Sequence, residues 1–190
     1  MSCTITTGRG LSCKDSVSGL KAIYIINYDD ISYENIEFDA TNTDEVEKWN
    51  PATQLTMYKY ELKGANSMET TVNSSRESGT TFFETALNIQ LKKQDVATHK
   101  TIKLLAYGRP RIVVRTMTNQ FFLMGVEQGS DLIGGTISSG QNLGDFNGYS
   151  MNFQSQETLP SPFLKCADEA ELKVLFNTVI DGSGDDAIIL

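Results

Sequence analysis

The sequence contains few of the residues on which catalytic and metal sites usually depend. Its 190 residues include one histidine, three cysteines and one tryptophan. His99 lies in the polar stretch ATHKT, so we expect an exposed side chain, and no other histidine could serve as the base of a triad. Cys3, Cys13 and Cys166 lack the short C-x-x-C type of spacing that presents two thiolates to one zinc ion. We therefore expect no metal site, no cofactor and no enzymatic activity.

Long apolar runs and phosphate-binding patterns are also missing. No segment approaches the ~20 apolar residues of a membrane-spanning helix, and residues 1–19 contain no apolar core of a secretory signal. We therefore expect a protein made and kept in a cytoplasm, with reduced thiols. Glycines crowd the stretch from Gly125 to Gly148, but neither GxxxxGK[ST] nor GxGxxG occurs there. These glycines predict turns, bulges and a mobile loop.

What the chain does contain is the composition of one globular domain. Hydrophobic residues make up 39% of the sequence and charged residues 21%, which excludes a disordered chain or a fibre. A fold of this length buries roughly 70% of the surface that its unfolded chain exposes, so it needs no metal or disulfide for stability. The formal net charge is -8, and this sign argues against wrapping nucleic acid through phosphate contacts.

The net charge hides three blocks of opposite sign. Residues 29–48 hold eight acids and one lysine, a net of -7, and residues 168–186 have a net of -5. Between them, residues 92–115 hold seven bases and one acid, a net of +6. Such blocks are commonly solvated loops and faces. They also suit contacts between copies of the chain, because complementary charges guide and orient association.

Most of the chain shows the patterns of β-strands. Residues 20–28 are apolar on both faces and predict a strand buried from both sides. Residues 55–63 alternate between apolar and charged side chains, and we expect residues 69–76 to be their hairpin partner across GANS. The clearest alternation is in residues 80–93, whose length predicts a strand that spans a sheet or projects beyond it.

Two further strand patterns follow. The segments RIVVRTM and QFFLMGV are expected to form a hairpin across residues 118–120. The segment GYSMNFQSQE alternates apolar and polar side chains and predicts a closing strand.

Helical spacing occurs in three places. Residues 94–107 predict a helix with Asp95 as its N-cap, ended by the glycine and proline that follow. Residues 43–49 suggest a short helix, because Val46 and Trp49 are three positions apart. Residues 167–180 predict a small helix that docks by one apolar face, formed by Leu172, Leu175, Phe176 and Val179.

These elements predict a mainly β (α+β) fold. We expect an antiparallel β-sandwich or barrel flanked by one helix, with a short C-terminal helix, because the strands come as hairpins and one helix separates them. The expected organisation is an extended N-terminal arm over residues 1–19, the sandwich or barrel over residues 20–163, and a C-terminal helix with an acidic tail over residues 164–190.

The order of elements resembles that of tail-tube-like proteins of tailed bacteriophages. The resemblance rests on the long strand TTFFETALNIQLKK, the helix QDVATHKTIKLLAY, the hairpin, the Gly-rich stretch and the closing strand. The ending LGDFNGYSMNFQSQETLPSPF and the opening GRGLSCKDSVSGLKAIYI are also similar to those of such virion proteins. The pattern covers nearly the whole chain, but it does not require the C-terminal acidic helix or the DAIIL tail.

The resemblance implies a subunit without catalytic residues that assembles into six-fold or twelve-fold rings. Stacked rings would form the tail tube or neck through which DNA passes without specific binding. The partners would be further copies of the chain and other tail or neck proteins, and the place would be the virion, after assembly in the host cytoplasm. Both the repeated tube protein and a single-ring connector stay open.

We formulate two hypotheses about such a ring. The first is that a basic patch on one subunit meets the acidic segment of its neighbour, because the two blocks carry opposite charge. The residues concerned are Lys92, Lys93, Arg109, Arg111 and Arg115 on one side, and Asp29, Asp30, Glu34, Glu37 and Asp39 on the other. The second is that the channel wall is acidic overall, since such a wall repels phosphate and lets DNA slide.

Two other classes of protein remain as alternatives. A ligand- or receptor-binding β-sandwich of a virion would be favoured if Trp49, Tyr58 and Tyr60 formed an exposed cluster on one face. A hydrolase that uses carboxylates would need a deep pocket with converging acids.

Overall fold

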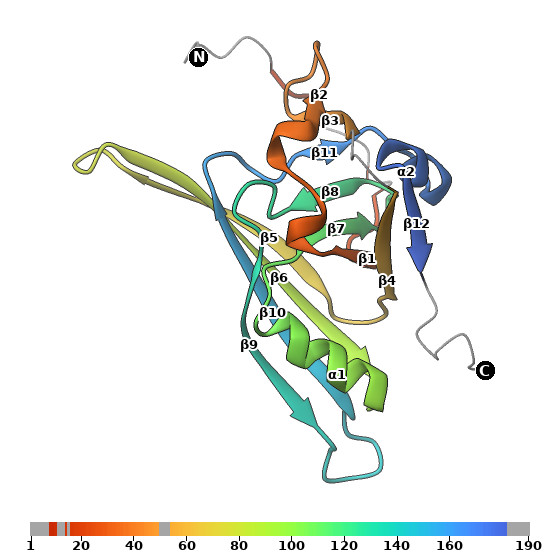
Figure 1. The fold of residues 1–190 in the computed structure, drawn as a ribbon. Coiled ribbons are helices and arrows are strands. Elements are labelled where there is room, and N and C mark those ends of the chain that lie inside the picture. Colours follow the sequence, from red (N-terminus) through yellow and green to blue (C-terminus); the bar gives the residue numbers. More distant parts are fainter. Residues whose placement is uncertain (1–7, 11–13, 15, 50–53, 182–190) are drawn as a thin grey trace.

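The computed structural model describes residues 8–10, 14, 16–49 and 54–181 of the chain. Two β-sheets make up most of this part (Figure 1). The larger sheet has eight strands in the order β12 (Thr178–Asp181), β4 (Leu55–Glu61), β1 (Leu20–Ile26), β7 (Arg111–Thr116), β8 (Phe121–Met124), β11 (Phe163–Leu164), β3 (Glu45–Trp49) and β2 (Ile36–Phe38).

The smaller sheet has four strands and packs against the larger one. Its order is β5 (Ser67–Ser75), β6 (Thr80–Lys92), β10 (Gly148–Glu157) and β9 (Asp131–Ser138). The helices are α1 (Val96–Leu105), α2 (Glu169–Leu175) and the short 3-10 turns η1 (Tyr28–Asp30) and η2 (Tyr33–Asn35). Neither α-helix of the described residues is long and apolar enough to cross a membrane.

The predicted fold class is confirmed. The fold is mainly β, with a curled eight-stranded sheet, a four-stranded sheet and two α-helices, of which the second is short and C-terminal. Most neighbouring strands are antiparallel, as expected from the hairpins. The exceptions among the described strands are the pairs β3–β11 and β4–β12, which are parallel.

The apolar core lies on both faces of the central strands. On β1, Tyr24 and Ile26 belong to a cluster on one face of the large sheet, whereas Ile23 and Ile25 belong to a second cluster between the two sheets. All four side chains are at most 4% exposed. The prediction of a strand buried on both sides is therefore confirmed.

Helix α1 begins as its sequence predicts. The Asp95 side chain accepts hydrogen bonds from the backbone N–H groups of Ala97 and Thr98, as an N-cap does. The Tyr149 hydroxyl of β10 donates to the Asp95 carbonyl (2.9 Å), which fixes the start of the helix on the small sheet. Ile102 and Leu105 pack against the cluster between the sheets.

Helix α2 docks on the large sheet, as predicted, but it is shorter than expected. Leu172, Leu175 and Phe176 are buried in the first cluster. The helix ends at Leu175 because Asn177 adopts a left-handed conformation (φ 46°), and the chain continues as β12. The expectation that Val179 lies on the docking face is wrong, since this side chain is exposed on β12.

Two other local predictions are wrong. Residues 43–49 contain no helix, because Glu45–Trp49 is strand β3. Residues 69–76 do not pair with β4: strand β5 pairs with β6 in the small sheet, and β4 pairs with β1 and β12 in the large one. The GANS segment therefore connects two sheets.

The glycine-rich stretch contains a strand that its composition conceals. Strand β9 pairs with β10 over most of its length. A side chain at Gly135 would lie 2.7 Å from the carbonyl oxygen of Ser150, so only a glycine lets the two strands approach at this position. The prediction of a mobile loop is wrong for residues 131–138.

The predicted arm and tail lie largely outside the described residues. Those residues before β1 that are described form no helix or strand and are exposed. Cys3, Cys13 and residues 182–190, which include most of the acidic tail, belong to the part that is not described.

Candidate assembly surfaces

Arg111 does not lie on the surface predicted for it. Its side chain is 1% exposed at the start of β7. Its Nε donates to the Val126 carbonyl (3.0 Å), and its Nη1 donates to the carbonyls of Tyr28 (2.7 Å) and Ile31 (2.8 Å). Burial lowers the pKa of Arg111, but a guanidinium stays charged in a protein. The prediction of an assembly contact is wrong, because Arg111 fastens two loops to β7 inside the subunit.

Arg109 remains exposed and lies near the same tyrosine. Its guanidinium carbon is 4.9 Å from the centroid of the Tyr28 ring, and the Tyr28 hydroxyl donates to the Glu127 carbonyl (2.9 Å). Asp29 and Asp30 follow Tyr28 directly and are exposed. Two residues of the predicted acidic segment thus lie beside the predicted basic patch of their own chain.

Arg115 forms hydrogen bonds with the turn between β7 and β8. Its Nε and Nη2 donate to the Asn119 side-chain oxygen (3.2 and 2.8 Å), and its guanidinium lies over the Phe121 ring at 5.2 Å. Asn119 has a left-handed backbone (φ 59°) that this contact supports. Arg115 lies at the opposite end of β7 from Arg111 and does not extend the predicted basic patch.

The remaining predicted bases belong to a separate group of lysines. Lys92 and Lys93 are exposed where β6 leads into α1, and Lys100 and Lys103 are exposed on α1 itself. No ion pair joins any of the four to another described residue. We call these four lysines the basic end of the subunit.

The predicted acidic residues past Ile31 form an ordered unit. Glu34 lies on η2 and Glu37 on β2, and both are exposed. Asp39 accepts a hydrogen bond from Lys165 (2.6 Å), and Lys165 also pairs with Glu47 of β3 (2.8 Å). The Lys165 contact holds the pKa of Asp39 well below its ordinary value. We call residues 32–48 the acidic cap; these residues are folded and include η2, β2 and most of β3.

The aromatic residues do not form an exposed binding face. Trp49 is 1% exposed, and its ring lies 5.1 Å from that of Phe176. Tyr60 is partly buried, and only Tyr58 is well exposed, at 41%. The observation that would have favoured a ligand-binding module is therefore absent from the described residues.

Two open grooves flank the cap side of the large sheet. One, of about 840 Å³, is lined by Met68, Phe122 and Phe163 among others, and a second, of about 970 Å³, includes Lys165 and Cys166. Burial raises the pKa of the Cys166 thiol to about 12, so it carries no nucleophilic thiolate at neutral pH. Among the described residues, no three metal-binding side chains gather at one point.

A long hairpin leaves the body of the subunit. Strands β5 and β6 pair from Ser67–Asn88 to Ser75–Thr80, and their distal part projects away from both sheets (Figure 1). Exposed side chains there include the apolar Val72 (59%) and Phe82 (36%). The edge of β5 and the edge of β9 have no neighbouring strand within the described chain.

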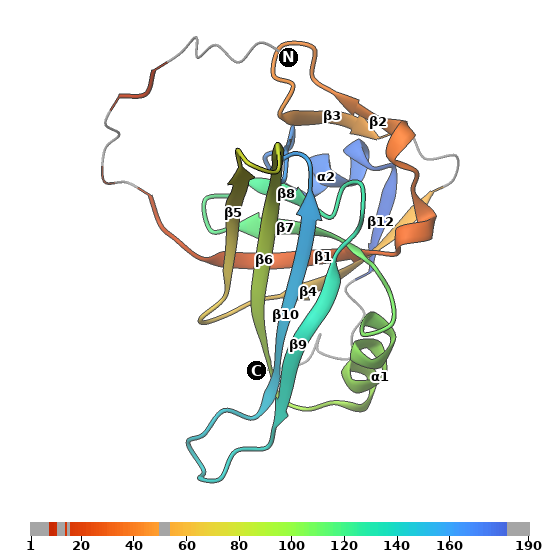
Figure 2. The ribbon, with the colours of Figure 1, turned by 90° about the vertical axis from the view of Figure 1, so that its left-hand side faces the viewer.

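The outer face of the small sheet is polar and uncovered. Asn88 pairs with Asn152 and Gln90 with Ser150, and these four side chains share this face because strand residues alternate between faces. Figure 2 views the sheet from this side, and no described helix or strand lies over it. Its charged residues in or beside the strands are Glu69, Glu84, Asp131 and Lys92.

Comparison with protein families, curated proteins and solved structures finds no match for the chain.

Proposed function

We propose that this protein is a structural subunit that assembles with further copies of itself into rings. The resemblance noted from the sequence suggests the tail tube or neck of a tailed phage as the place of these rings. In this proposal the protein has no catalytic role, and DNA passes through the ring.

The β5–β6 hairpin is the observation that carries the proposal. A two-stranded ribbon is marginally stable in water unless a third strand or another surface packs against it. Strand β10 accompanies β6 only as far as Phe83, so the last three pairs of the hairpin, Asn73–Phe82 to Ser75–Thr80, have neither within the described chain. Phe82 is exposed in this part, and Val72 is exposed at its base. A second copy is the partner that would cover it in a ring.

The open edges of the small sheet support the same proposal. Soluble proteins usually protect edge strands with charges, prolines or bulges. Strand β9 has a single charge, Asp131, and carries exposed Ile133 (61%) and Ile137 (51%). A ring can bury such edges against its neighbours, and obligate interfaces commonly exceed about 2,000 Å² in total.

The outer face of the small sheet is the surface best suited to line a channel. Amide and hydroxyl groups dominate it, and its acids outnumber its single lysine. A wall of this kind offers phosphates little attraction, so duplex DNA could move along it. This agrees with the hypothesis of a channel wall that is acidic overall.

Electron microscopy of the purified full chain tests the proposal. We expect negative-stain images to show rings with an axial channel wide enough for duplex DNA, and mass photometry to show one dominant multiple of 21.0 kDa. A monomer at the highest soluble concentration, unchanged by a crowding agent, would contradict it.

A further inference from the structure

The outward face of α1 is unusually apolar for a helix surrounded by solvent. Val96, Leu104 and Tyr107 are 87%, 63% and 85% exposed. Val96, Lys100, Lys103 and Leu104 occupy positions i, i+4, i+7 and i+8, which form one stripe on a helix, and Tyr107 lies in the turn that follows α1. The inward stripe already packs on the sheets through Ile102 and Leu105. The outward stripe is therefore a second face without a partner in the described chain.

One more exposed apolar side chain lies on the small sheet, next to the buried Tyr149 that contacts the start of α1. The Tyr149 ring of β10 lies 6.3 Å from the ring of His99 on α1, and Tyr149 pairs with Ile137 of β9. Ile137 is 51% exposed. Exposed apolar side chains gathered in this way, with an aromatic residue included, are typical of a protein interface rather than of a solvated face.

The acidic cap is complementary to the α1 stripe in charge, and it also exposes apolar side chains. Its exposed acids include Glu34 and Asp44, and Tyr33 beside them is 41% exposed. Residues 32–48 hold six acids and one lysine. A shallow depression here is lined by Tyr33, Phe38 and Leu159 together with the acidic Asp44 and Glu157. The cap thus offers apolar contact surrounded by negative charge.

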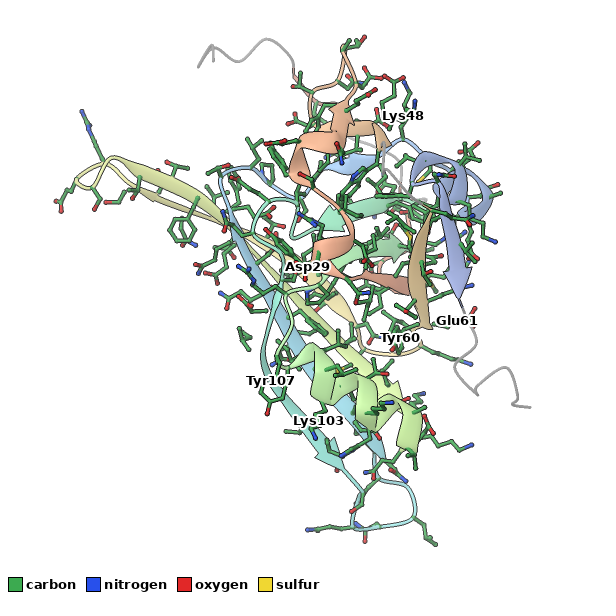
Figure 3. All side chains as sticks on the ribbon, viewed as in Figure 1. Asp29, Lys48, Tyr60, Glu61, Lys103 and Tyr107 are labelled. Carbon is green, nitrogen blue, oxygen red and sulfur yellow. The ribbon has the colours of Figure 1, made fainter. Side chains whose placement is uncertain are left out.

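The two surfaces lie well apart on the subunit. Figure 3 shows Lys48 of the cap near the top of the view, Lys103 and Tyr107 in its lower half, and Asp29 between them. One chain therefore cannot bring its own α1 stripe onto its own cap. A two-fold dimer through either surface alone would place like charges together, which opposes association.

We propose that the α1 stripe of one copy docks on the acidic cap of the next copy, head to tail. Such a heterologous contact either closes into a ring or continues as a stack. The inference rests on the proposed self-assembly and names the surfaces that carry it. It revises the pairing expected from sequence. On the basic side, Lys100 and Lys103 take the place of Arg111 and Arg115. On the acidic side, Glu34 is kept and Asp44 takes the place of Asp29 and Asp30.

Charge swaps test the head-to-tail contact. The variant Lys100→Glu/Lys103→Glu lowers the net charge of the four residues of the basic end from +4 to 0, and Glu34→Lys/Asp44→Lys changes that of the cap from -5 to -1. We expect each alone to assemble at least about tenfold more weakly than the wild type, because most of the charge attraction between the two surfaces is then lost. An equimolar mixture should recover assembly, with the two variants in equal amounts by native mass spectrometry.

A matched control separates this contact from a general effect of charge. Lys21→Glu/Lys173→Glu makes the same change in net charge as Lys100→Glu/Lys103→Glu on exposed residues that belong to neither the α1 stripe nor the cap, and it should assemble like the wild type. Thermal unfolding followed by circular dichroism shows that each variant is folded.

The possible outcomes distinguish the two proposals. If the wild type forms rings and the swapped variants form them equally well, the head-to-tail contact is wrong and self-assembly stands. If the variants lose assembly but their mixture does not recover it, the proposed pairing of these two ends is wrong. If the wild type never assembles, both proposals fail.

Discussion

Arg111 contacts Tyr28 in two ways at once: its guanidinium carbon lies 4.3 Å from the centroid of the tyrosine ring, and its Nη1 donates to the backbone carbonyl of the same tyrosine at 2.7 Å. The guanidinium thus recognises both the side chain and the main chain of one residue. This contact holds the segment that leads into the acidic cap against the centre of the large sheet.

Replacing Arg111 by methionine should destabilise the subunit strongly. The change leaves the carbonyls of Tyr28, Ile31 and Val126 without their donor in a buried site, which we expect to cost about 3–5 kcal/mol. Urea unfolding measures the loss. Arg109→Met removes an exposed contact with the same ring and should cost only about 0.5–1 kcal/mol. Equal losses of unfolding free energy for the two variants would show that the buried hydrogen bonds of Arg111 do not account for its contribution to stability.

Gly148→Ala should disturb the junction of β6 and β10. Gly148 has φ +156°, and a Cβ there would collide with the backbone oxygen of Leu91. We expect a loss of at least about 2 kcal/mol in the free energy of unfolding, because backbone must move to make room. Gly144→Ala is the matched control, since a Cβ at that position meets nothing within 4 Å. A stable G148A protein would mean that the strands separate easily at this end.

Glu157 should make stability fall as pH rises above about 4.5. Its carboxylate accepts N–H bonds from Glu127 (2.7 Å) and Gln128 (3.2 Å), yet burial outweighs them and raises its pKa. The folded protein therefore retains a proton that the unfolded chain has already released. The stabilising contribution is complete below the unfolded pKa and is lost as pH rises through the folded pKa.

Urea unfolding at a series of pH values tests this for Glu157→Gln. The variant should show a flatter dependence of unfolding free energy on pH above about 4.5 than the wild type. Glu77→Gln changes an exposed carboxylate in the turn of the β5–β6 hairpin and should leave the wild-type slope. If E157Q keeps the wild-type slope, another group is responsible for it.

The hairpin should matter for assembly and not for folding. Val72→Ser/Phe82→Ser removes the two exposed apolar side chains of its distal part, so the monomer should keep its unfolding free energy within about 0.5 kcal/mol. Mass photometry should show markedly fewer assemblies. Met117→Ser, at a position 51% exposed outside the hairpin, serves as the control. Undiminished assembly of the hairpin variant would remove the main support for the proposed function.

The sequence predicted those elements whose signals are local. The alternation along residues 80–93 gave β6, and the Asp95 cap gave the start of α1. Strand β3 was mistaken for a helix for a physical reason. A register shift between β2 and β3 lets Val46 and Trp49 both face the core, although they are three positions apart. That spacing imitates one face of a helix.

Other features depend on partners that local sequence does not reveal. Strand β9 is stabilised by β10, and its glycines hid it. The charges do cluster along the sequence, but Arg111 shows that residues of one cluster need not all lie on the surface of the fold. Its position on a strand buried on both faces puts one of the five predicted bases inside the subunit. The basic end could be found from sequence only by placing Lys100 and Lys103 on the outward face of the helix.

The double burial of β1 also has a consequence for biosynthesis. Its neighbours are β4 and β7, and both follow it in the chain. Until β7 has been made, the segment LKAIYII exposes two apolar faces and an unpaired strand edge, and Lys21 is its only charged residue. Short, β-prone, nearly uncharged segments of this kind are where nascent chains aggregate. Slow translation at low temperature, or a chaperone that covers this segment, should therefore raise the soluble yield more than any substitution that stabilises the finished fold.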